Sequence, residues 1–353
     1  MSPSKDALSI QRSRQRRGYL LLALAMLIVC TVYATFRKLQ ALRNDLFLPP
    51  GVKAIPNISS AMSPSGPLWA SDHEVVTYDG GQEKLVDIRS GTAIPIQAWG
   101  QETGIFNPEQ MQVSPDGNLL LCANGPDDAP LWSIALLRGG QTWDRPRAIH
   151  SGTLSFSWLP DSRHWVELVR RQGRMAVILS SMDDTKSKQI LLPDNMFLGR
   201  IVGITPEGDI LTSGGRIIFV PSQFELAQLS LRANNPTVKK IVVTPPGSPR
   251  SEPQLPYFYA LSPDGKRLAW LLTWATPPNA FQHLIMRLSH PQWNTMYPMA
   301  SLWITDLDGK HPRQIVANFP TSGSWMGLAW MKDGKHLSFY DRGSLCIVDV
   351  NPP

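Results

Sequence analysis

Short apolar runs separated by polar turn residues recur from about residue 63 to the end of the chain. Val113–Leu121 and Leu261–Trp270 show the pattern most clearly: each consists of an apolar run, a Ser-Pro-Asp-Gly turn and a second apolar run. In such a turn, proline presets φ at the second position, aspartate tolerates the third, and glycine accepts a positive φ. Each stretch therefore predicts two β-strands joined by a tight turn.

The same hairpin pattern occurs six times at nearly regular spacing. The acidic residues that mark the six turns are Asp72, Asp116, Asp161, Glu207, Asp264 and Asp333. Their successive spacings are 44, 45, 46, 57 and 69 residues, and a period near 45 matches one four-stranded blade of a β-propeller. The chain is therefore predicted to be all-β, a six-bladed β-propeller with four-stranded blades. The weak first and fourth units leave five or seven blades open.

The last unit is one strand short. It has two strands around Asp333 and a third over residues 344–350, after which the sequence ends at Pro353. An unclosed ring would expose a sheet edge, and exposed edges invite aggregation. We therefore predict that Val52–Ile58, or the segment just after it, supplies the missing outer strand and closes the last blade.

The fifth unit carries a longer motif. Its turn is followed by Leu-Trp-x-x-Asp-x-Asp-Gly (Leu302–Gly309) and then Arg-Gln-Ile (Arg313–Ile315). This combination resembles the WD-repeat-like units of TolB-type β-propellers, and the resemblance covers about residues 63–353. It implies a propeller fold but no catalytic residue, because the motif residues are turn and core residues. TolB itself is a soluble periplasmic protein with an additional N-terminal domain. Here an apolar segment stands in that place, so TolB's role and partners are not implied.

An uncharged stretch of 19 residues, Gly18–Phe36, precedes the repeats. As a helix at about 1.5 Å per residue it would be about 28 Å long, close to the hydrocarbon thickness of a bilayer. We therefore predict a transmembrane α-helix here, in contact with the lipid bilayer. The predicted organisation is a cytoplasmic basic tail over 1–17, the transmembrane helix over 18–36, a linker with the possible closing strand over 37–62, and the propeller over 63–353.

Two alternatives to an uncleaved anchor stay open, namely a cleaved signal peptide and a lipoprotein modified at Cys30. A signal peptide has a shorter apolar core and small residues before its cleavage site. The bulky Tyr33 disfavours cleavage after Ala34, and Val29 is large for the position before a lipidated cysteine. The pattern favours the anchor.

Basic residues gather around the apolar stretch. The chain has 34 Lys and Arg against 28 Asp and Glu, a net charge of +6. Residues 1–45 hold eight of the basic and two of the acidic residues, so the remainder has 26 of each. Five basic residues precede the stretch and three follow it, which favours a cytoplasmic N-terminus and a periplasmic or extracellular propeller. Because the remainder is neutral, the basic pI does not indicate nucleic-acid binding.

Linear signatures of catalysis are missing from the sequence. No Gly-x-Ser-x-Gly nucleophile elbow, Gly-rich phosphate loop or His-Glu-x-x-His motif occurs. His283 and His290 are seven residues apart, but no nearby Cys, Asp or Glu completes a metal site. We therefore predict no catalytic, cofactor-binding or metal-ligating residues and no cofactor. Cys122 and Cys346 are flanked by apolar residues and are expected to be buried thiols, with a single disulfide left open.

Residues 273–300 interrupt the fifth unit before its Leu-Trp strand. Long insertions in propellers project from one face, and exposed aromatic residues are frequent at binding hot spots. The candidate interaction surface consists of the insert's aromatic residues Trp274, Phe281, Trp293 and Tyr297. The alternative is that these aromatics only pack the insert onto the propeller.

These observations favour a membrane-anchored extracytoplasmic β-propeller that acts as a non-enzymatic scaffold for a protein, an extracellular polymer or another ligand. One alternative is a propeller enzyme, a lyase or hydrolase whose channel-mouth site is built from scattered His, Asp and Arg residues. Another is a sensory domain that signals through the anchor.

Overall fold

The structure is a computed structural model in which Met1–Leu48 and Pro49–Pro353 form two compact units. It describes residues 26–27, 31, 48–55, 58, 66–79, 82–96, 106–124, 131–138, 147–183, 187–193, 198–214, 224–231, 236–243, 255–276, 297–321, 327–341 and 343–351.

Three described residues fall in the predicted membrane segment. Met26, Leu27 and Thr31 have helical backbone, and the Thr31 hydroxyl donates a hydrogen bond to the Leu27 carbonyl at 2.7 Å. Within the described part of the chain, no helix is both long and apolar enough to cross a membrane. Because most of residues 18–36 lie outside that part, the transmembrane helix stays a prediction.

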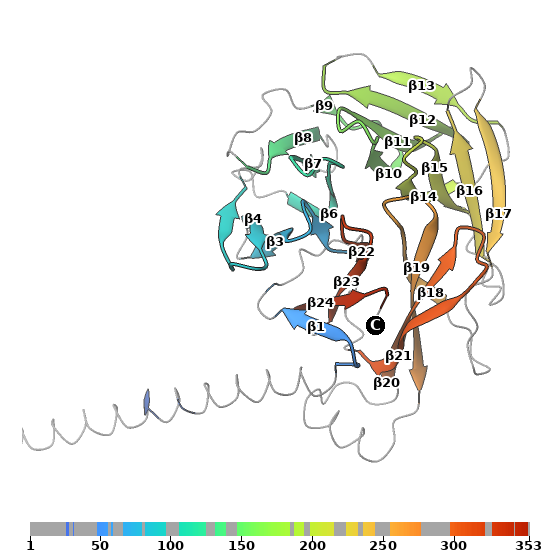
Figure 1. Cartoon of the computed structure of the whole chain (residues 1–353). Coiled ribbons are helices and arrows are strands. Elements are labelled where there is room, and N and C mark those ends of the chain that lie inside the picture. The colour runs from blue at the N-terminus through green and yellow to red at the C-terminus, as the bar shows by residue number, and fades with distance from the viewer. Residues whose placement is uncertain are drawn as a thin grey trace, which may run out of the picture. The chain divides into compact units, whose positions relative to one another are not determined.

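The second unit consists of six antiparallel four-stranded sheets, the blades of a propeller (Figure 1). Blade 1 comprises β2 (Leu68–Trp69), β3 (Glu74–Asp79), β4 (Gln82–Asp87) and β5 (Ala93–Pro95). Blade 2 comprises β6 (Phe106–Val113), β7 (Leu119–Asn124), β8 (Leu131–Leu136) and β9 (Arg147–Ala148). Blade 3 comprises β10 (Thr153–Trp158), β11 (His164–Arg171), β12 (Arg174–Ser181) and β13 (Lys188–Leu191).

The remaining blades repeat this order. Blade 4 comprises β14 (Leu198–Ile204), β15 (Ile210–Gly214), β16 (Phe224–Ser230) and β17 (Thr237–Val243). Blade 5 comprises β18 (Leu255–Leu261), β19 (Arg267–Thr276), β20 (Tyr297–Asp306) and β21 (Arg313–Pro320). Blade 6 comprises β22 (Leu328–Trp330), β23 (His336–Asp341), β24 (Ser344–Asp349) and β1 (Val52–Ile55).

The first strands of the blades line the central axis. Contacts run from β2 to β6 and on through β10, β14 and β18 to β22, in the order of the blades. The prediction of an all-β, six-bladed propeller with four-stranded blades is therefore confirmed, including the weak first and fourth units.

Blade 6 takes its outer strand from the N-terminal side of the propeller. β1 pairs antiparallel with β24, with Val52 opposite Val348 and Ile55 opposite Leu345. The predicted closing strand is thus confirmed, although the paired segment ends at Ile55. Pairing β1 with β24 covers the backbone groups that β24 would otherwise expose as a sheet edge.

Tryptophans at the ends of first strands join neighbouring blades. Trp158 Nε1 donates to the Gln112 carbonyl of the preceding blade at 3.0 Å, and Trp330 Nε1 donates to the Ala260 carbonyl at 3.0 Å. Both carbonyls belong to the residue four positions before the acidic turn residue. The repeat therefore extends from the hairpins to the contacts between blades.

The junction between blades 6 and 1 uses a variation of this contact. Trp69 Nε1 donates to Ser338 Oγ at 2.7 Å, and Ser338 Oγ donates to the carbonyl of Ala329 at 3.3 Å. Ala329 holds the same repeat position as the two acceptors above. One hydroxyl group thus bridges the gap where the ring closes.

The core lies between the faces of adjacent blades. In β19, the five residues Leu268–Leu272 are all 0% exposed, because both faces of this strand are covered. A strand that is buried on both faces has apolar residues at consecutive positions. This explains why apolar and polar residues do not alternate in this segment. Trp165 and Trp270 are the largest fully buried side chains.

The Ser-Pro-Asp-Gly turns form as the sequence predicts. In blade 2, the Gly117 N–H donates to the Ser114 carbonyl at 2.9 Å and Gly117 has a φ of 75°. The Ser114 hydroxyl donates to Asp116 Oδ1 at 2.5 Å and accepts the N–H of Leu119 at 2.9 Å. The turn therefore satisfies its own polar groups before the second strand begins.

The interruption of blade 5 is shorter than predicted. β19 continues to Thr276 and β20 begins at Tyr297, and these two residues are opposite each other in the ladder. Residues 273–276 and 297–300, assigned to the insert from the sequence, are therefore strand.

Cys122 and Cys346 are buried free thiols, as predicted. They lie in different blades, on β7 and β24. Burial raises the pKa of the Cys122 thiol well above its ordinary value, and the nearby Glu83 carboxylate adds to this effect. The thiol therefore stays protonated and packs as an apolar group.

A matched pair of glycine substitutions tests the packing of blade 2 against blade 1. A β-carbon added to Gly117 would lie 1.8 Å from the Ala70 carbonyl oxygen, whereas one added to Gly208 in blade 4 meets nothing within 4 Å. Both residues have positive φ, so each alanine substitution costs about 1–2 kcal/mol of backbone strain. We expect Gly117→Ala to lower the free energy of unfolding several-fold more than Gly208→Ala, measured by chemical denaturation. Equal losses would contradict the blade contact.

Candidate functional site at the channel mouth

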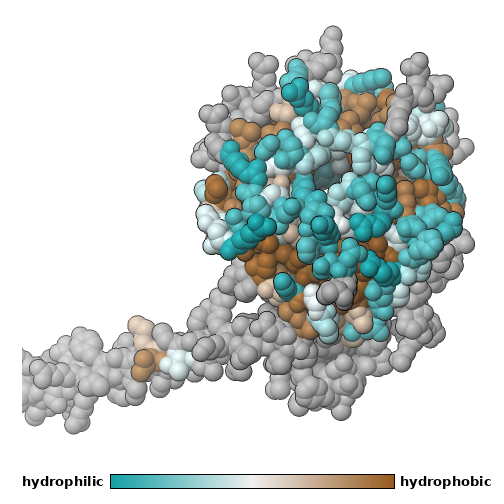
Figure 2. Space-filling view, viewed as in Figure 1, coloured by the Kyte–Doolittle hydropathy of each residue, from teal (hydrophilic) through white to brown (hydrophobic). Residues whose placement is uncertain are grey.

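The turns between the first and second strands gather around one mouth of the central channel. Contacts between neighbouring turns hold them there: the Asp116 N–H donates to Ser162 Oγ of blade 3 at 2.9 Å. On another side of the ring, Arg267 Nη2 donates to the Gly334 carbonyl of blade 6 at 3.0 Å. Figure 2 shows this end of the ring, with a central hollow surrounded mainly by hydrophilic residues. Polar groups that converge on a hollow make this mouth the candidate site.

The turn carboxylates at the mouth are held by their own turns. In blade 5, Asp264 Oδ1 accepts the Ser262 hydroxyl at 2.5 Å and the Lys266 N–H at 3.2 Å. Burial alone would raise the pKa of Asp264, but the hydrogen bonds from Ser262 and Lys266 outweigh it and leave the pKa below its ordinary 3.8. The pKa of Asp116 is lowered in the same way. Both carboxylates are therefore charged at neutral pH.

Two turns, in blades 3 and 6, carry Asp–His pairs. His164 Nδ1 lies 2.6 Å from Asp161 Oδ2, and His336 Nδ1 lies 2.5 Å from Asp333 Oδ2. In both pairs the histidine is the third residue after the aspartate, and the other carboxylate oxygen accepts two backbone N–H groups of the turn. The sequence analysis did not single out these pairs. The signal that could have found them is Asp-x-x-His in two of the six repeats.

An arginine links the turns of blades 1 and 2. Arg138, just after β8, forms a two-pronged ion pair with Glu74 and donates to the Gly117 carbonyl at 3.3 Å and to Asn118 Oδ1 at 3.0 Å. The hydrogen bond from Arg138 is the main reason that the pKa of Glu74 lies below its ordinary value. Arg138 therefore ties the start of β3 to the neighbouring turn.

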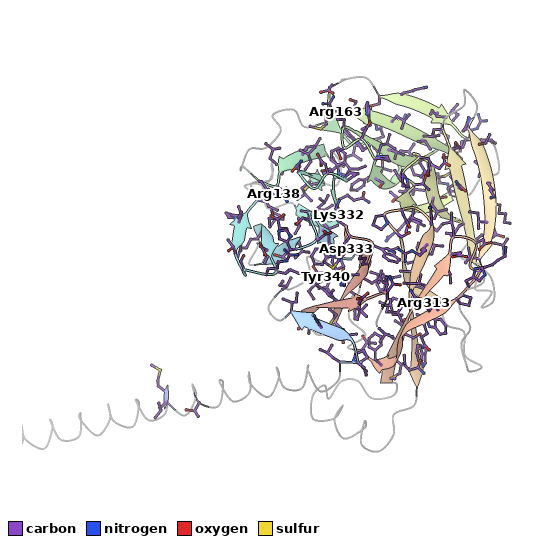
Figure 3. The ribbon with its side chains drawn as sticks, viewed as in Figure 1. Arg138, Arg163, Arg313, Lys332, Asp333 and Tyr340 are labelled. Carbon is purple, nitrogen blue, oxygen red and sulfur yellow. The ribbon has the colours of Figure 1, made fainter. Side chains whose placement is uncertain are left out.

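A lysine crosses the rim from blade 6 to blade 2. Lys332 Nζ donates to the carbonyls of Ser114 at 3.0 Å and Pro115 at 2.9 Å. Figure 3 shows Lys332 near the centre of the ring, next to Asp333. Neither Lys332 nor Arg138 was among the residues that the sequence analysis selected.

The described side chains at the mouth form a fixed polar rim. Their carboxylates accept hydrogen bonds from turn N–H groups, hydroxyls and basic side chains, and this holds them in position. In the described ranges, no group of three or more His, Cys, Asp and Glu residues is placed to hold a metal ion. The arrangement can present a rigid pattern of charges, and at two turns it holds an imidazole against a carboxylate.

Two of the predicted interaction residues, Trp274 and Tyr297, belong to the other end of blade 5. β19 begins beside the Asp264 turn and ends at Thr276, so Trp274 lies away from the channel mouth. Trp274 is partly buried and lies opposite Met299, and Tyr297 is the first residue of β20. Phe281 and Trp293 lie outside the described residues. The structure thus places Trp274 and Tyr297 on adjacent strands, and their role stays a prediction.

The turn carboxylates predict a defined loss of stability in acid. Because the pKa of Asp264 is lowered in the fold, its charge stabilises the protein above its ordinary pKa of 3.8, and this contribution is lost as the pH falls below that value. We expect Asp264→Asn to lower the melting temperature at pH 7 and the difference from wild type to shrink below pH 3.8. The exposed Asp183→Asn is the control for loss of one surface charge. A difference that is the same at pH 7 and pH 2.5 would contradict this account.

The comparisons with known proteins concern the fold. No protein-family model matches the sequence, and no curated protein matches it. Among solved structures, the chain is similar to a putative TolB from Agrobacterium tumefaciens, with 13% identity over 82% of this chain and 90% of that one and a TM-score of 0.47. It is similar to TolB from Acinetobacter baumannii, with 12% identity over 85% and 63% and a TM-score of 0.43. It is also similar to the β-propeller domain of Cps50 (Swd1) from Myceliophteria thermophila, with 12% identity over 81% and 83% and a TM-score of 0.42.

Proposed function

We propose that this protein is a membrane-anchored β-propeller that acts outside the cytoplasm as a non-enzymatic scaffold for a protein or an extracellular polymer. The observation that carries the proposal is the length of the β19–β20 ladder, which continues at the end of blade 5 away from the channel mouth to Ala275 opposite Pro298 and Thr276 opposite Tyr297. A long, regular ladder on a rigid ring is suited to docking a partner.

The aromatic content of the hairpin supports the choice of surface. Trp274 lies on β19 and Tyr297 on β20 at this end of the ladder, and aromatic residues are frequent at binding hot spots. The propeller itself has equal numbers of acidic and basic residues after residue 45. Shape and aromatic contacts, more than bulk charge, would therefore select the partner.

The anchor rests on the apolar stretch and its flanking charges. Residues 18–36 are long enough to span a bilayer as a helix, and Met26 and Leu27 are each 64% exposed. Exposed apolar side chains cost free energy in water and would be covered by lipid in a membrane. The five preceding basic residues support a cytoplasmic N-terminus.

A scaffold fits the chemistry of the mouth better than an enzyme does. Catalytic carboxylates usually have pKa values raised toward the working pH. Here the pKa values of Asp116 and Asp264 are lowered by hydrogen bonds from their own turns, which suits structural charges.

A second candidate is the propeller enzyme, a lyase or hydrolase, and the Asp–His pairs favour it. A carboxylate that orients Nδ1 leaves Nε2 of His164 or His336 to act as a general base. The two candidate functions predict different effects of replacing these histidines. Replacing either histidine with alanine should leave partner capture unchanged if the protein is a scaffold, and should remove turnover if it is an enzyme.

Substitution of Trp274 tests the scaffold proposal. We expect the tagged full-length chain to fractionate with membranes and, after chemical crosslinking in cells, to retain a partner in a pull-down. Trp274→Ala should reduce capture of that partner about tenfold or more, because truncating a hot-spot tryptophan costs at least 2 kcal/mol. Leu191→Ala on blade 3, where Leu191 is 55% exposed, is the matched control for loss of a surface apolar side chain.

The melting temperature of both variants should stay within a few degrees of wild type. Capture that is equal for Trp274→Ala and Leu191→Ala would contradict the proposed surface. Recovery of the wild-type chain in the soluble fraction would contradict the anchor.

A further inference from the structure

The first strands, which line the channel, are shortest at the junction where the ring closes. β2 of blade 1 has two residues and β22 of blade 6 has three, whereas the other four first strands have six to eight. These two short strands belong to neighbouring blades. β2 pairs with β3 through Leu68 and Trp69 alone. Among the described residues, β2 and β22 therefore have fewer paired residues with their second strands than the other first strands have.

The turn of blade 1 is also the least regular of the six. Its sequence is Ala70-Ser71-Asp72-His73, without the proline and glycine that shape the turns of blades 2, 4 and 5. The Ala70 and Ser71 N–H groups both reach the Glu74 carbonyl, at 2.9 and 3.3 Å. Blade 1 thus enters the ring with a short inner strand and a turn that lacks the usual conformational restraints.

Lys332 breaks the repeat pattern at the adjoining blade. Pro115, Pro160, Pro206 and Pro263 occupy the equivalent position in blades 2 to 5. A proline there presets the turn, whereas Lys332 gives up that restraint and gains a side chain long enough to reach another turn. The substitution in the repeat is therefore accompanied by a new contact.

That contact passes over blade 1. Lys332 Nζ donates to the carbonyls of Ser114 and Pro115 in blade 2, which follows blade 1 in the ring. This hydrogen bond therefore joins two blades that are not neighbours in the ring. Lys332 and its two acceptors therefore enclose the turn of blade 1 from the side of the channel.

Two carboxylates accompany the ammonium group. Burial lowers the pKa of Lys332, and the charges of Asp116 and Asp72 oppose that effect. These two aspartates come from the turns of blades 2 and 1, so the lysine is surrounded by groups from all three blades. The ammonium is partly buried, and the two backbone carbonyls that accept its hydrogen bonds replace part of its water shell.

We propose that Lys332 is a latch that closes the ring at its inner rim, holding blade 1 between blades 6 and 2, while β1 closes the outer rim. The two closures lie at opposite edges of blade 6, with Lys332 next to the inner strand β22 and β1 at the outer edge. Removing the latch frees the inner strands at the junction and leaves the far side of the ring unchanged.

Hydrogen exchange of Lys332→Met distinguishes a latch from a general contribution to stability. Methionine keeps most of the length of the side chain and removes the ammonium. We expect amides in β2, β3 and β22 to exchange about tenfold or more faster under native conditions, and amides in β14 and β15 of blade 4 to be unaffected. Lys335→Met, at an exposed neighbour on the same turn, is the matched control. Unchanged exchange at the junction, or an equal increase in blade 4, would overturn the proposal.

Acylation of the wild-type protein gives a second test that needs no variant. The amine of a latched Lys332 is shielded by three turns, whereas Lys335 is exposed. With a water-soluble acetylating ester at neutral pH, mass spectrometry should show Lys332 modified at least ten times more slowly than Lys335. Equal rates would show that the ammonium is not held by the Ser114 and Pro115 carbonyls. If Lys332→Met fails to fold, this measurement decides the question.

Discussion

A propeller depends on one constraint, which is that the last blade must be joined to the first. Each of the other five blades is built from four consecutive strands. Blade 6 has three consecutive strands, β22 to β24, and needs a fourth from an earlier part of the chain. The pairing of Val52–Ile55 with β24 meets this need, and it removes the sheet edge that an incomplete blade would present.

The repeating contacts follow from that closed geometry. Because each blade faces the next in the same orientation, an indole at the end of one first strand reaches the same carbonyl in the preceding blade, as Trp158 and Trp330 do. At the junction the geometry differs slightly, and Ser338 bridges Trp69 to the equivalent carbonyl. Lys332 adds a further tie at the same junction. Two departures from the repeat, at Ser338 and Lys332, thus lie where the ring closes.

The sequence was sufficient to predict the parts of the fold that are local. Ser114 to Gly117 carry enough turn chemistry to predict a hairpin, and the spacing of six such turns predicts the blade number. The closing strand could be predicted because the sequence showed three strands, and not four, for blade 6. The extent of the insert was misjudged because residues 273–276 lie beyond the last repeat signal, and only the ladder with residues 297–300 shows that they are strand.

The side chains at the channel mouth were harder to foresee. Lys332 and the Ser114 carbonyl are 218 residues apart, and no local pattern connects them. The one visible sign was a lysine at a position where four other units have proline. The sign of the Asp–His pairs in the sequence was the Asp-x-x-His spacing, as in Asp161 and His164. Departures from a repeat are therefore as informative about the site as the repeat is about the fold.

The register of the closing strand can be tested directly by a disulfide between its two partners. Ala54 lies opposite Cys346, and paired residues in antiparallel strands have Cα atoms about 4.5–5.5 Å apart, within the range that a disulfide spans. Ala54→Cys should therefore form a disulfide with Cys346 on mild oxidation and raise the melting temperature until a reductant is added. Lys53→Cys, opposite Ile347, should keep its thiol free. An Ala54→Cys variant that stays fully reduced, or that crosslinks no better than Lys53→Cys, would contradict the closure of the ring by β1.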